Sequence, residues 1–268
     1  MVKNNRFISR KFADWQCLSG SWLKVIAMVS MLIDHTASHL LRHVEAFNEP
    51  LVSLGHHHMT WYFLMRCVGR LAFPLFAFLL VEGFLHTHSR KHYGRNLLMF
   101  ALISEIPWNL THGGHIYGFS QNVFFTLFLG FLGLCAIERY REDRYRQALS
   151  LLGLFALSIL LFCDYGCKGF SFIIMLYLLR QRPLFRAIVG AGMLGWGWIA
   201  GLAFIPISMY NGLRGFIQGP IAKYLFYAFY PAHLLALYFI KMWLMCSNAI
   251  RCISRSAARW DSLFSAFP

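Results

Sequence analysis

The stretch WLKVIAMVSMLIDHTASHLLR, residues 22–42, opens the apolar part of the chain and indicates its fold class. It has the length of a helix that crosses the hydrocarbon core of a membrane, which takes about 20 mostly apolar residues. Its second half carries Asp34, His35 and His39 where lipid-facing side chains are expected. Ionisable groups at such positions need a partner, a water-filled cavity or a function.

The whole chain has the composition of a membrane protein. Of its 268 residues, 58% are hydrophobic and 13% are charged, whereas soluble domains carry about 25% charged residues. Apolar segments lie near residues 22–42, 61–87, 95–110, 122–138, 147–163, 169–180, 186–208 and 221–246. The sequence therefore predicts an all-α polytopic bundle of about eight transmembrane helices. We expect one membrane domain (22–246) between a basic N-terminal segment (1–21) and a C-terminal tail (247–268).

The formal net charge of +14 is explained by topology rather than by nucleic-acid binding. With the N-terminus in the cytoplasm, three basic residues fall in outer loops, namely Arg42, Lys168 and Arg214. Seventeen fall in or beside the inner segments: Lys3, Arg6, Arg10, Lys11, Arg90, Lys91, Arg95, Arg139, Arg141, Arg144, Arg146, Arg180, Arg182, Arg186, Arg251, Arg255 and Arg259. Basic loops stay on the cytoplasmic side. This pattern predicts two cytoplasmic termini in a multi-pass protein of a bacterial inner membrane.

Several ionisable side chains share one predicted depth, in the outer half of the membrane. They are Asp34, His35, Arg66, Arg70, Glu105 and His233. Because neighbouring residues on a helix diverge by about 100°, Asp34 and His35 face different partners. We expect Asp34 to pair with Arg66 or Arg70 on the second helix, which leaves His35 for another group.

Structural interpretations stay open for these residues. An Asp34–Arg70 pair is also compatible with a purely structural role in helix register, and His35 and His233 with ordinary helix packing. We interpret His39, His43 and the run at 56–58 as solvated histidines, with a metal site as the alternative, and we expect no metal. Cys163 and Cys167 are interpreted as packing residues, with a disulfide as the alternative in an oxidising compartment.

Prolines and polar loops accompany this layer. Pro74 is predicted to kink the second helix and Pro107 to end the third. The loop THGGHIYGFSQN ends in Gln121 and Asn122, and SMYNGLRGFIQGP carries Asn211 and Arg214, followed by Lys223. We expect both loops at the outer face, where they would cap a cavity and supply substrate contacts.

Five motifs together resemble the TraX family: LKVIAMVSMLIDH, GRLAFPLFAFLLVEGFLHTHS, LISEIPWNL, YNGLRG and KYLFYAFYPAHLLALY. They occur in family order between residue 22 and about residue 240. The family is named after a conjugation protein that N-acetylates the pilin subunit, and it is similar to a compact form of the integral-membrane acyltransferase-3 superfamily. The resemblance implies acetyl transfer from cytoplasmic acetyl-CoA to an amine or hydroxyl acceptor at the outer face.

Within this resemblance we assign roles as a hypothesis. His35 is the general base, held by Glu105 or His233, and Arg70 stabilises the thioester oxygen while Asp34 balances its charge. An acetyl-imidazole at His35 or His233 is the alternative route. Substrate contacts are expected from Arg66, Gln121, Asn122, Asn211, Arg214 and Lys223.

Two other classes of protein stay open from the sequence. A proton-coupled transporter also places acidic, basic and imidazole groups at one depth. A non-catalytic membrane assembly subunit would need the same groups only for its structure.

Overall fold

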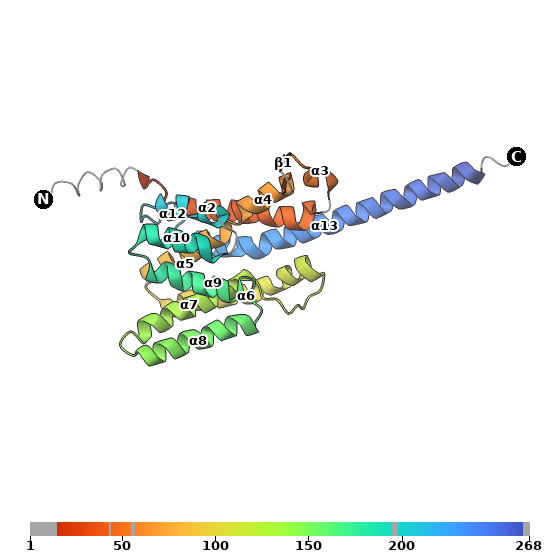
Figure 1. Cartoon of the computed structure of the whole chain (residues 1–268). Helices are drawn as coiled ribbons and strands as arrows, with labels where there is room; N and C mark the ends of the chain where they lie inside the picture. The colour runs from red at the N-terminus through yellow and green to blue at the C-terminus, as the bar shows by residue number, and fades with distance from the viewer. Residues whose placement is uncertain (1–14, 43, 55–56, 195–197, 265–268) are drawn as a thin grey trace.

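The computed structural model describes residues 15–42, 44–54, 57–194 and 198–264 and is mostly helical (Figure 1). Its elements are α2 (Gly20–Thr36), η1 (Ala37–Leu41, a π-helix), α3 (Glu45–Asn48), β1 (Val52–Leu54), β2 (His57–Met59), α4 (Trp61–Gly69), α5 (Ala72–His86), α6 (Arg90–Gly113), α7 (Val123–Arg139), α8 (Arg144–Leu160), α9 (Gly166–Leu178), α10 (Pro183–Met193), α11 (Trp198–Gly201), α12 (Phe204–Ser208) and α13 (Gly219–Phe264). The strands form one antiparallel hairpin. The predicted helical fold is confirmed.

Side-chain caps mark where several of these helices begin. The oxygens of Thr60, Ser89, Asn122 and Asp143 accept hydrogen bonds from the backbone N–H groups of Phe63, His92, Phe124 and Arg146. Such caps satisfy donors that have no acceptor within the helix. The starts of α4, α6, α7 and α8 are therefore encoded locally.

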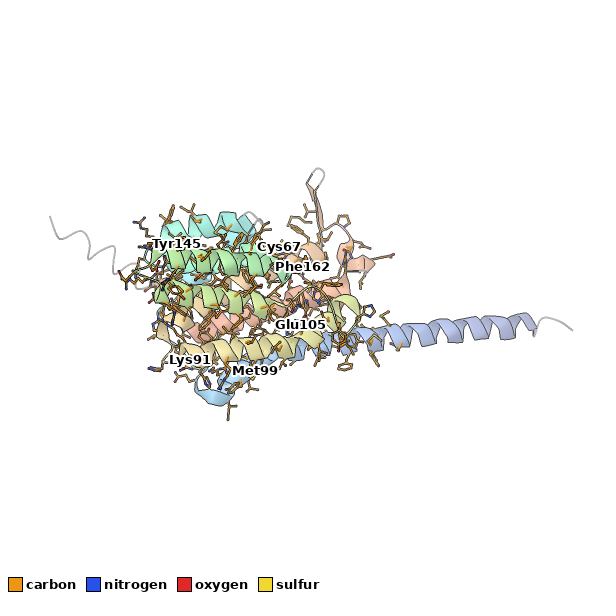
Figure 2. The ribbon with its side chains drawn as sticks, turned by 90° about the horizontal axis from the view of Figure 1, so that it is seen from below. Cys67, Lys91, Met99, Glu105, Tyr145 and Phe162 are labelled. Carbon is orange, nitrogen blue, oxygen red and sulfur yellow. The ribbon has the colours of Figure 1, made fainter. Side chains whose placement is uncertain are left out.

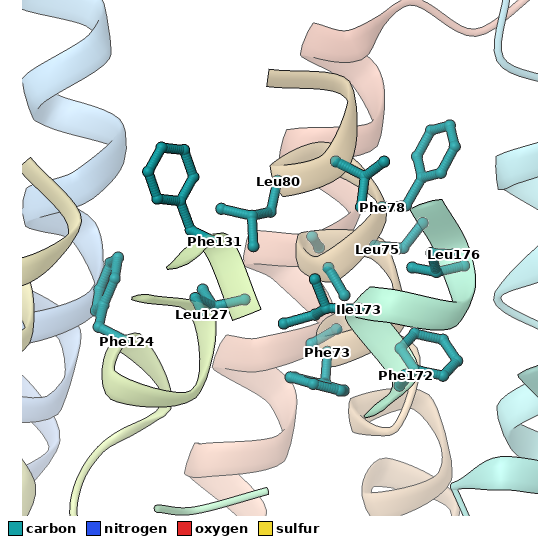
Figure 3. Close-up of a cluster of buried hydrophobic side chains, with 14 of the residues drawn as sticks. Phe73, Leu75, Phe78, Leu80, Phe124, Leu127, Phe131, Phe172, Ile173 and Leu176 are labelled. Carbon is teal, nitrogen blue, oxygen red and sulfur yellow. The ribbon is translucent and has the colours of Figure 1, made fainter. Parts of the chain in front are cut away.

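The core lies between α5, α7 and α9. Figure 3 shows Phe73, Leu75, Phe78 and Leu80 of α5 meeting Leu127 and Phe131 of α7 and Phe172, Ile173 and Leu176 of α9. By contrast, α8 lies at the margin of the bundle and exposes Leu149, Leu152, Ile159 and Leu160. Exposed apolar rows of this kind suit contact with lipid.

The prediction for Pro107 is wrong, whereas the second helix is interrupted near Pro74 as predicted. α6 continues through Pro107 to Gly113 instead of ending there. The second apolar segment breaks before Pro74, between α4 and α5 at Arg70 and Leu71. Pro74 lies in the first turn of α5, where a helix needs no N–H donor.

The helices have two ends, which we call the Gly20 end and the Gly113 end after the residues found there. The predicted crossing at 186–208 is wrong, because α10 turns back through α11 and α12 to the Gly20 end. Tyr210 pairs with Leu18, and Gly20 N donates to the Leu213 carbonyl oxygen at 2.8 Å. With 11 residues, α10 is about 16 Å long, about half the thickness of a bilayer core. Its turn packs Phe204 against Gly190, where a Cβ would lie 2.2 Å from the ring.

One consequence is that residues 15 and 264, the two ends of the described part of the chain, lie at opposite ends of the bundle (Figure 1). α13 starts at the Gly20 end, runs beside α2 and α6, and extends past the other helices beyond the Gly113 end (Figure 1). The prediction of both termini at one side is therefore wrong for the described residues 15–264. The predicted boundary between 246 and 247 falls inside α13, which is continuous there.

Candidate functional site

His35 and His233 form the centre of the site. They come from α2 and α13, 198 positions apart, and His35 Nδ1 lies 2.7 Å from His233 Nε2. His233 Nδ1 lies 2.8 Å from the carbonyl oxygen of Phe229. Because a carbonyl oxygen only accepts, neutral His233 donates from Nδ1 and accepts at Nε2. His35 then donates from Nδ1, which leaves Nε2 as its lone-pair nitrogen.

Asp34 faces the opposite way, toward α4. Its Oδ2 accepts a hydrogen bond from Arg66 Nη1 at 2.7 Å, and the two side chains are 17% and 24% exposed. The close approach depends on Gly69, where a Cβ would lie 2.1 Å from Asp34 Oδ1. The predicted divergence of Asp34 from His35 is confirmed, and the predicted pairing with the second helix takes place through Arg66.

Asp164 adds a carboxyl group beside this pair, in the turn between α8 and α9. Gln121 holds the turn through its backbone, since Asp164 N donates to the Gln121 carbonyl oxygen at 2.9 Å. Although water reaches the residue, protein surrounds most of the carboxyl group. This desolvation raises the pKa of Asp164 to about 7; Asp34 also raises it, while Arg70 and Arg66 oppose the rise. Arg70 thus lies within electrostatic reach of both carboxyl groups.

Glu105 hydrogen-bonds to Asn122, the N-cap of α7, rather than to His35. Its Oε2 accepts from Asn122 Nδ2 at 2.6 Å and its Oε1 from Asn109 Nδ2 at 3.3 Å. Asn122 is fully buried, caps α7 and also donates to the carbonyl oxygen of Ala101 at 2.8 Å. Glu105, labelled on α6 in Figure 2, therefore helps fasten α6 to the start of α7. Of the two partners considered for His35, His233 is the one that contacts it.

Two further histidines continue toward the Gly113 end. The ring of His39, on the π-helix, lies 5.7 Å from that of His35 and 4.9 Å from that of His112 on α6. In the described part of the chain, His39 Nε2 is buried without a hydrogen-bond partner. Those residues also contain no group of three side chains arranged to hold a metal ion. His43 and His56 lie outside the described residues, as do the side chains of His57 and His58.

A cavity of about 540 Å³ extends from the Gly20 end to Tyr230, whose ring neighbours both histidine rings, although neither histidine lines the cavity itself. Its inner part is apolar and aromatic and includes Met31, Phe124, Phe229 and Tyr230. The Tyr230 ring lies 6.2 Å from that of His35 and 5.6 Å from that of His233. This volume falls in the range of small-molecule sites.

The mouth of the cavity is basic. Lys24, Arg214 and Lys223 line it, and Arg214 is close enough to repel both lysines electrostatically. Asn211 and Arg214 were expected at the face opposite the N-terminal segment, and the structure instead brings them to the same end as that segment. Their loop is tied to the Gly20 end, where Asn211 N donates to the Leu18 carbonyl oxygen at 2.9 Å. Neighbouring cations of this kind favour an anionic ligand.

Sequence reasoning missed four of these residues: Lys24, His112, Asp164 and Tyr230. Asp164 had a signal, because it is a lone acid in the short turn CDYG between apolar segments. Tyr230 lies one helical turn before His233 and shares its face. The positions of Lys24 and His112 depend on tertiary contacts that no local pattern encodes.

Comparison with known proteins agrees with the motifs. A family model described as TraX protein matches residues 19–241. The chain belongs to the TraX family. This TraX-family chain is also 32% identical over 255 residues to a protein of Dichelobacter nodosus described as probable fimbrial assembly protein FimC, serogroup H1; the match covers 83% of the chain and 95% of the relative. No solved structure matches the chain.

Proposed function

We propose that the protein is an integral-membrane acetyltransferase that moves an acetyl group from cytoplasmic acetyl-CoA to an amine or hydroxyl acceptor at the outer face. The observation that carries this proposal is a basic-mouthed cavity whose inner end, at Tyr230, lies beside the His35–His233 pair. Lys24, Arg214 and Lys223 suit the CoA phosphates. The aromatic inner part suits the pantetheine arm, with the thioester reaching the histidines.

We place the protein in a bacterial inner membrane with the Gly20 end in the cytoplasm. Two helical stretches among the described residues, Trp61–His86 and Ile221–Ser247, are long and apolar enough to cross a membrane by length and composition. The loops at 87–89, 140–143 and 179–182 join helices at the Gly20 end, and the basic residues concentrate beside them. In this topology the segment at 183–208 is re-entrant and α13 runs outward.

The proposed chemistry follows from the tautomers of the two imidazoles. The acceptor nitrogen or oxygen attacks the thioester carbonyl carbon while His35 Nε2 takes its proton. His233 Nε2 keeps the Nδ1–H of His35 in place, so His233 is a positioning residue. When the tetrahedral intermediate collapses, the C–S bond breaks, and the sulfur leaves with the electron pair and takes the proton from His35.

The outer side of the pair supplies contacts for the acceptor. Arg66 and Asp34 neutralise each other at 2.7 Å, and Arg70 lies near Asp34 and Asp164. This mixed-charge face lies on the α4 side of α2, and in this proposal the acceptor reaches the pair from there while the donor enters through the basic mouth.

Labelled acetyl-CoA tests the proposal with the full-length protein in proteoliposomes and a short peptide with a free amino terminus as probe acceptor. We expect His35→Gln to lower acetyl transfer by about 10²–10⁴-fold, the usual contribution of a general base. His115→Gln, in the exposed loop after α6, is the matched control and should keep the wild-type rate. Wild-type protein that releases no thiol from acetyl-CoA would refute the proposal.

A non-catalytic role in pilus or fimbrial assembly is the second candidate, favoured by the description of the Dichelobacter nodosus relative. It predicts that His35→Gln lowers the abundance of the protein or of the assembled fibre while bulk acetylation stays unchanged. Mass spectrometry of cell-surface proteins and glycans, with and without the gene, separates the two roles by the presence or loss of an acetyl mark.

A further inference from the structure

Tyr230 has a buried hydroxyl whose proton has no acceptor among the described residues. The residue is 4% exposed, and its oxygen has no hydrogen-bond partner among the described residues. An unpaired buried hydroxyl costs about 1–3 kcal/mol, so buried polar groups nearly always have a partner. A buried hydroxyl without a hydrogen-bond partner on the wall of a cavity points to a ligand atom as its partner.

The N-terminus of α7 faces the same point. The backbone N–H of Val123, the first residue of that helix, faces the Tyr230 hydroxyl without closing a hydrogen bond to it. The first N–H groups of a helix lack acceptors within the helix. They also carry the positive end of the helix dipole, which favours negative charge.

These two donors lie where the reacting carbonyl is expected. Val123 and Tyr230 both line the cavity, and the Tyr230 ring neighbours both histidine rings. Asn122 occupies the next donor of the helix, because its Oδ1 accepts from Phe124 N at 3.0 Å. Glu105 holds Asn122 in that position, so the helix end is fixed before any ligand arrives.

We propose that the Tyr230 hydroxyl and the Val123 N–H form the oxyanion hole of this site, which takes the carbonyl oxygen of an acyl thioester. This inference rests on the proposed acetyl transfer and moves the oxyanion role away from Arg70, which neighbours Asp34 and Asp164. As the acceptor attacks, the carbonyl π electrons move onto oxygen, and the two donors stabilise that charge. The electrons return to carbon as the C–S bond breaks. Tyr230 is thus a catalytic residue, and Asn122 and Glu105 are positioning residues.

The variant Tyr230→Phe tests this assignment in the full-length protein. It removes one donor that has no partner among the described residues, so its melting temperature should stay at the wild-type value or rise. Loss of one oxyanion donor lowers turnover by about 10²–10³-fold, and we expect that loss in kcat, with the KM for acetyl-CoA nearly unchanged. Tyr238→Phe is the matched control, because Tyr238 lies two turns further along α13 and does not line the cavity.

A spectroscopic readout separates a catalytic role from a structural one. The infrared stretch of ¹³C-carbonyl acetyl-CoA should shift to lower frequency on binding the wild-type protein and return toward its solution value in Tyr230→Phe. An unchanged stretch, or a rate within a factor of two of wild type, overturns the oxyanion hole. If wild-type protein itself shows no thiol release, the proposed function fails instead.

A fluorotyrosine at position 230 keeps the test decisive if the phenylalanine variant does not fold. Its more acidic hydroxyl is a stronger donor in a side chain of nearly the same size. We expect a changed kcat and a further lowered carbonyl stretch, and an unchanged value of both overturns the inference.

Discussion

Gly69→Ala tests the packing that places Asp34 and His35. A Cβ at position 69 would lie 2.1, 2.3 and 2.4 Å from Oδ1, Cβ and Cγ of Asp34, whereas non-bonded carbon atoms rest about 3.5–4.0 Å apart. The overlap involves the Cβ of a helical residue, so α2 and α4 must separate. Overpacking of this kind costs about 1–3 kcal/mol. At about 2–4 °C per kcal/mol for a domain of this size, we expect the melting temperature to fall by several degrees.

Gly153→Ala is the matched control in the middle of α8. No atom lies within 4 Å of a Cβ built there, and alanine is more stable than glycine in a helix by about 0.5–1 kcal/mol. Thermal unfolding of both variants in one detergent should therefore move the melting temperatures in opposite directions. If Gly69→Ala melts at or above Gly153→Ala, the close contact between α2 and α4 does not exist as described.

The remaining predictions concern charge, capping and pH. Arg66→Met removes the hydrogen-bonded ion-pair partner of the Asp34 carboxylate and should destabilise the fold by about 1–3 kcal/mol. Adding Asp34→Asn should restore part of the loss, and purely additive effects in this cycle would contradict the pairing. Asn122→Ala removes the α7 cap and a Glu105 partner, which should cost about 1–2 kcal/mol in thermal unfolding; an unchanged melting temperature argues against the cap. The pKa of Asp164, about 7 in the fold, exceeds its ordinary value near 3.9. The stability from protonated Asp164 is therefore present below about pH 4 and lost as pH rises through 7. Asp164→Asn should flatten that pH dependence and melt higher than wild type at pH 8, and parallel curves would refute the raised pKa.

The helical class and the key pairs followed from local rules. The period of the helix separated Asp34 from His35, and the structure gives them Arg66 and His233 as partners. The free-energy cost of burying an ionisable side chain in a membrane indicated by itself that these groups needed partners. These inferences needed only the geometry of one helix and the depth of each group along it.

The errors arose where hydropathy has no directional information. An apolar stretch such as 186–208 has enough consecutive apolar residues to cross a membrane, and it has the same number if it turns back. The turn depends on a tertiary contact, the packing of Phe204 against Gly190. That one misplaced segment also reversed the expected end for Asn211, Arg214 and the C-terminus. Pro107 was given too much weight, because a proline only weakens a helix that tertiary packing supports.

Synthesis order gives the histidine pair a further meaning. Among the described helices, His35 belongs to the first long one to leave the ribosome and His233 to the last, 198 positions later. The polar face of α2 therefore waits in the membrane without its imidazole partner until α13 has inserted. Any chain that stops before α13 lacks both His233 and Tyr230. A partly made protein thus has no complete site, and the proposed activity begins only when translation is nearly finished.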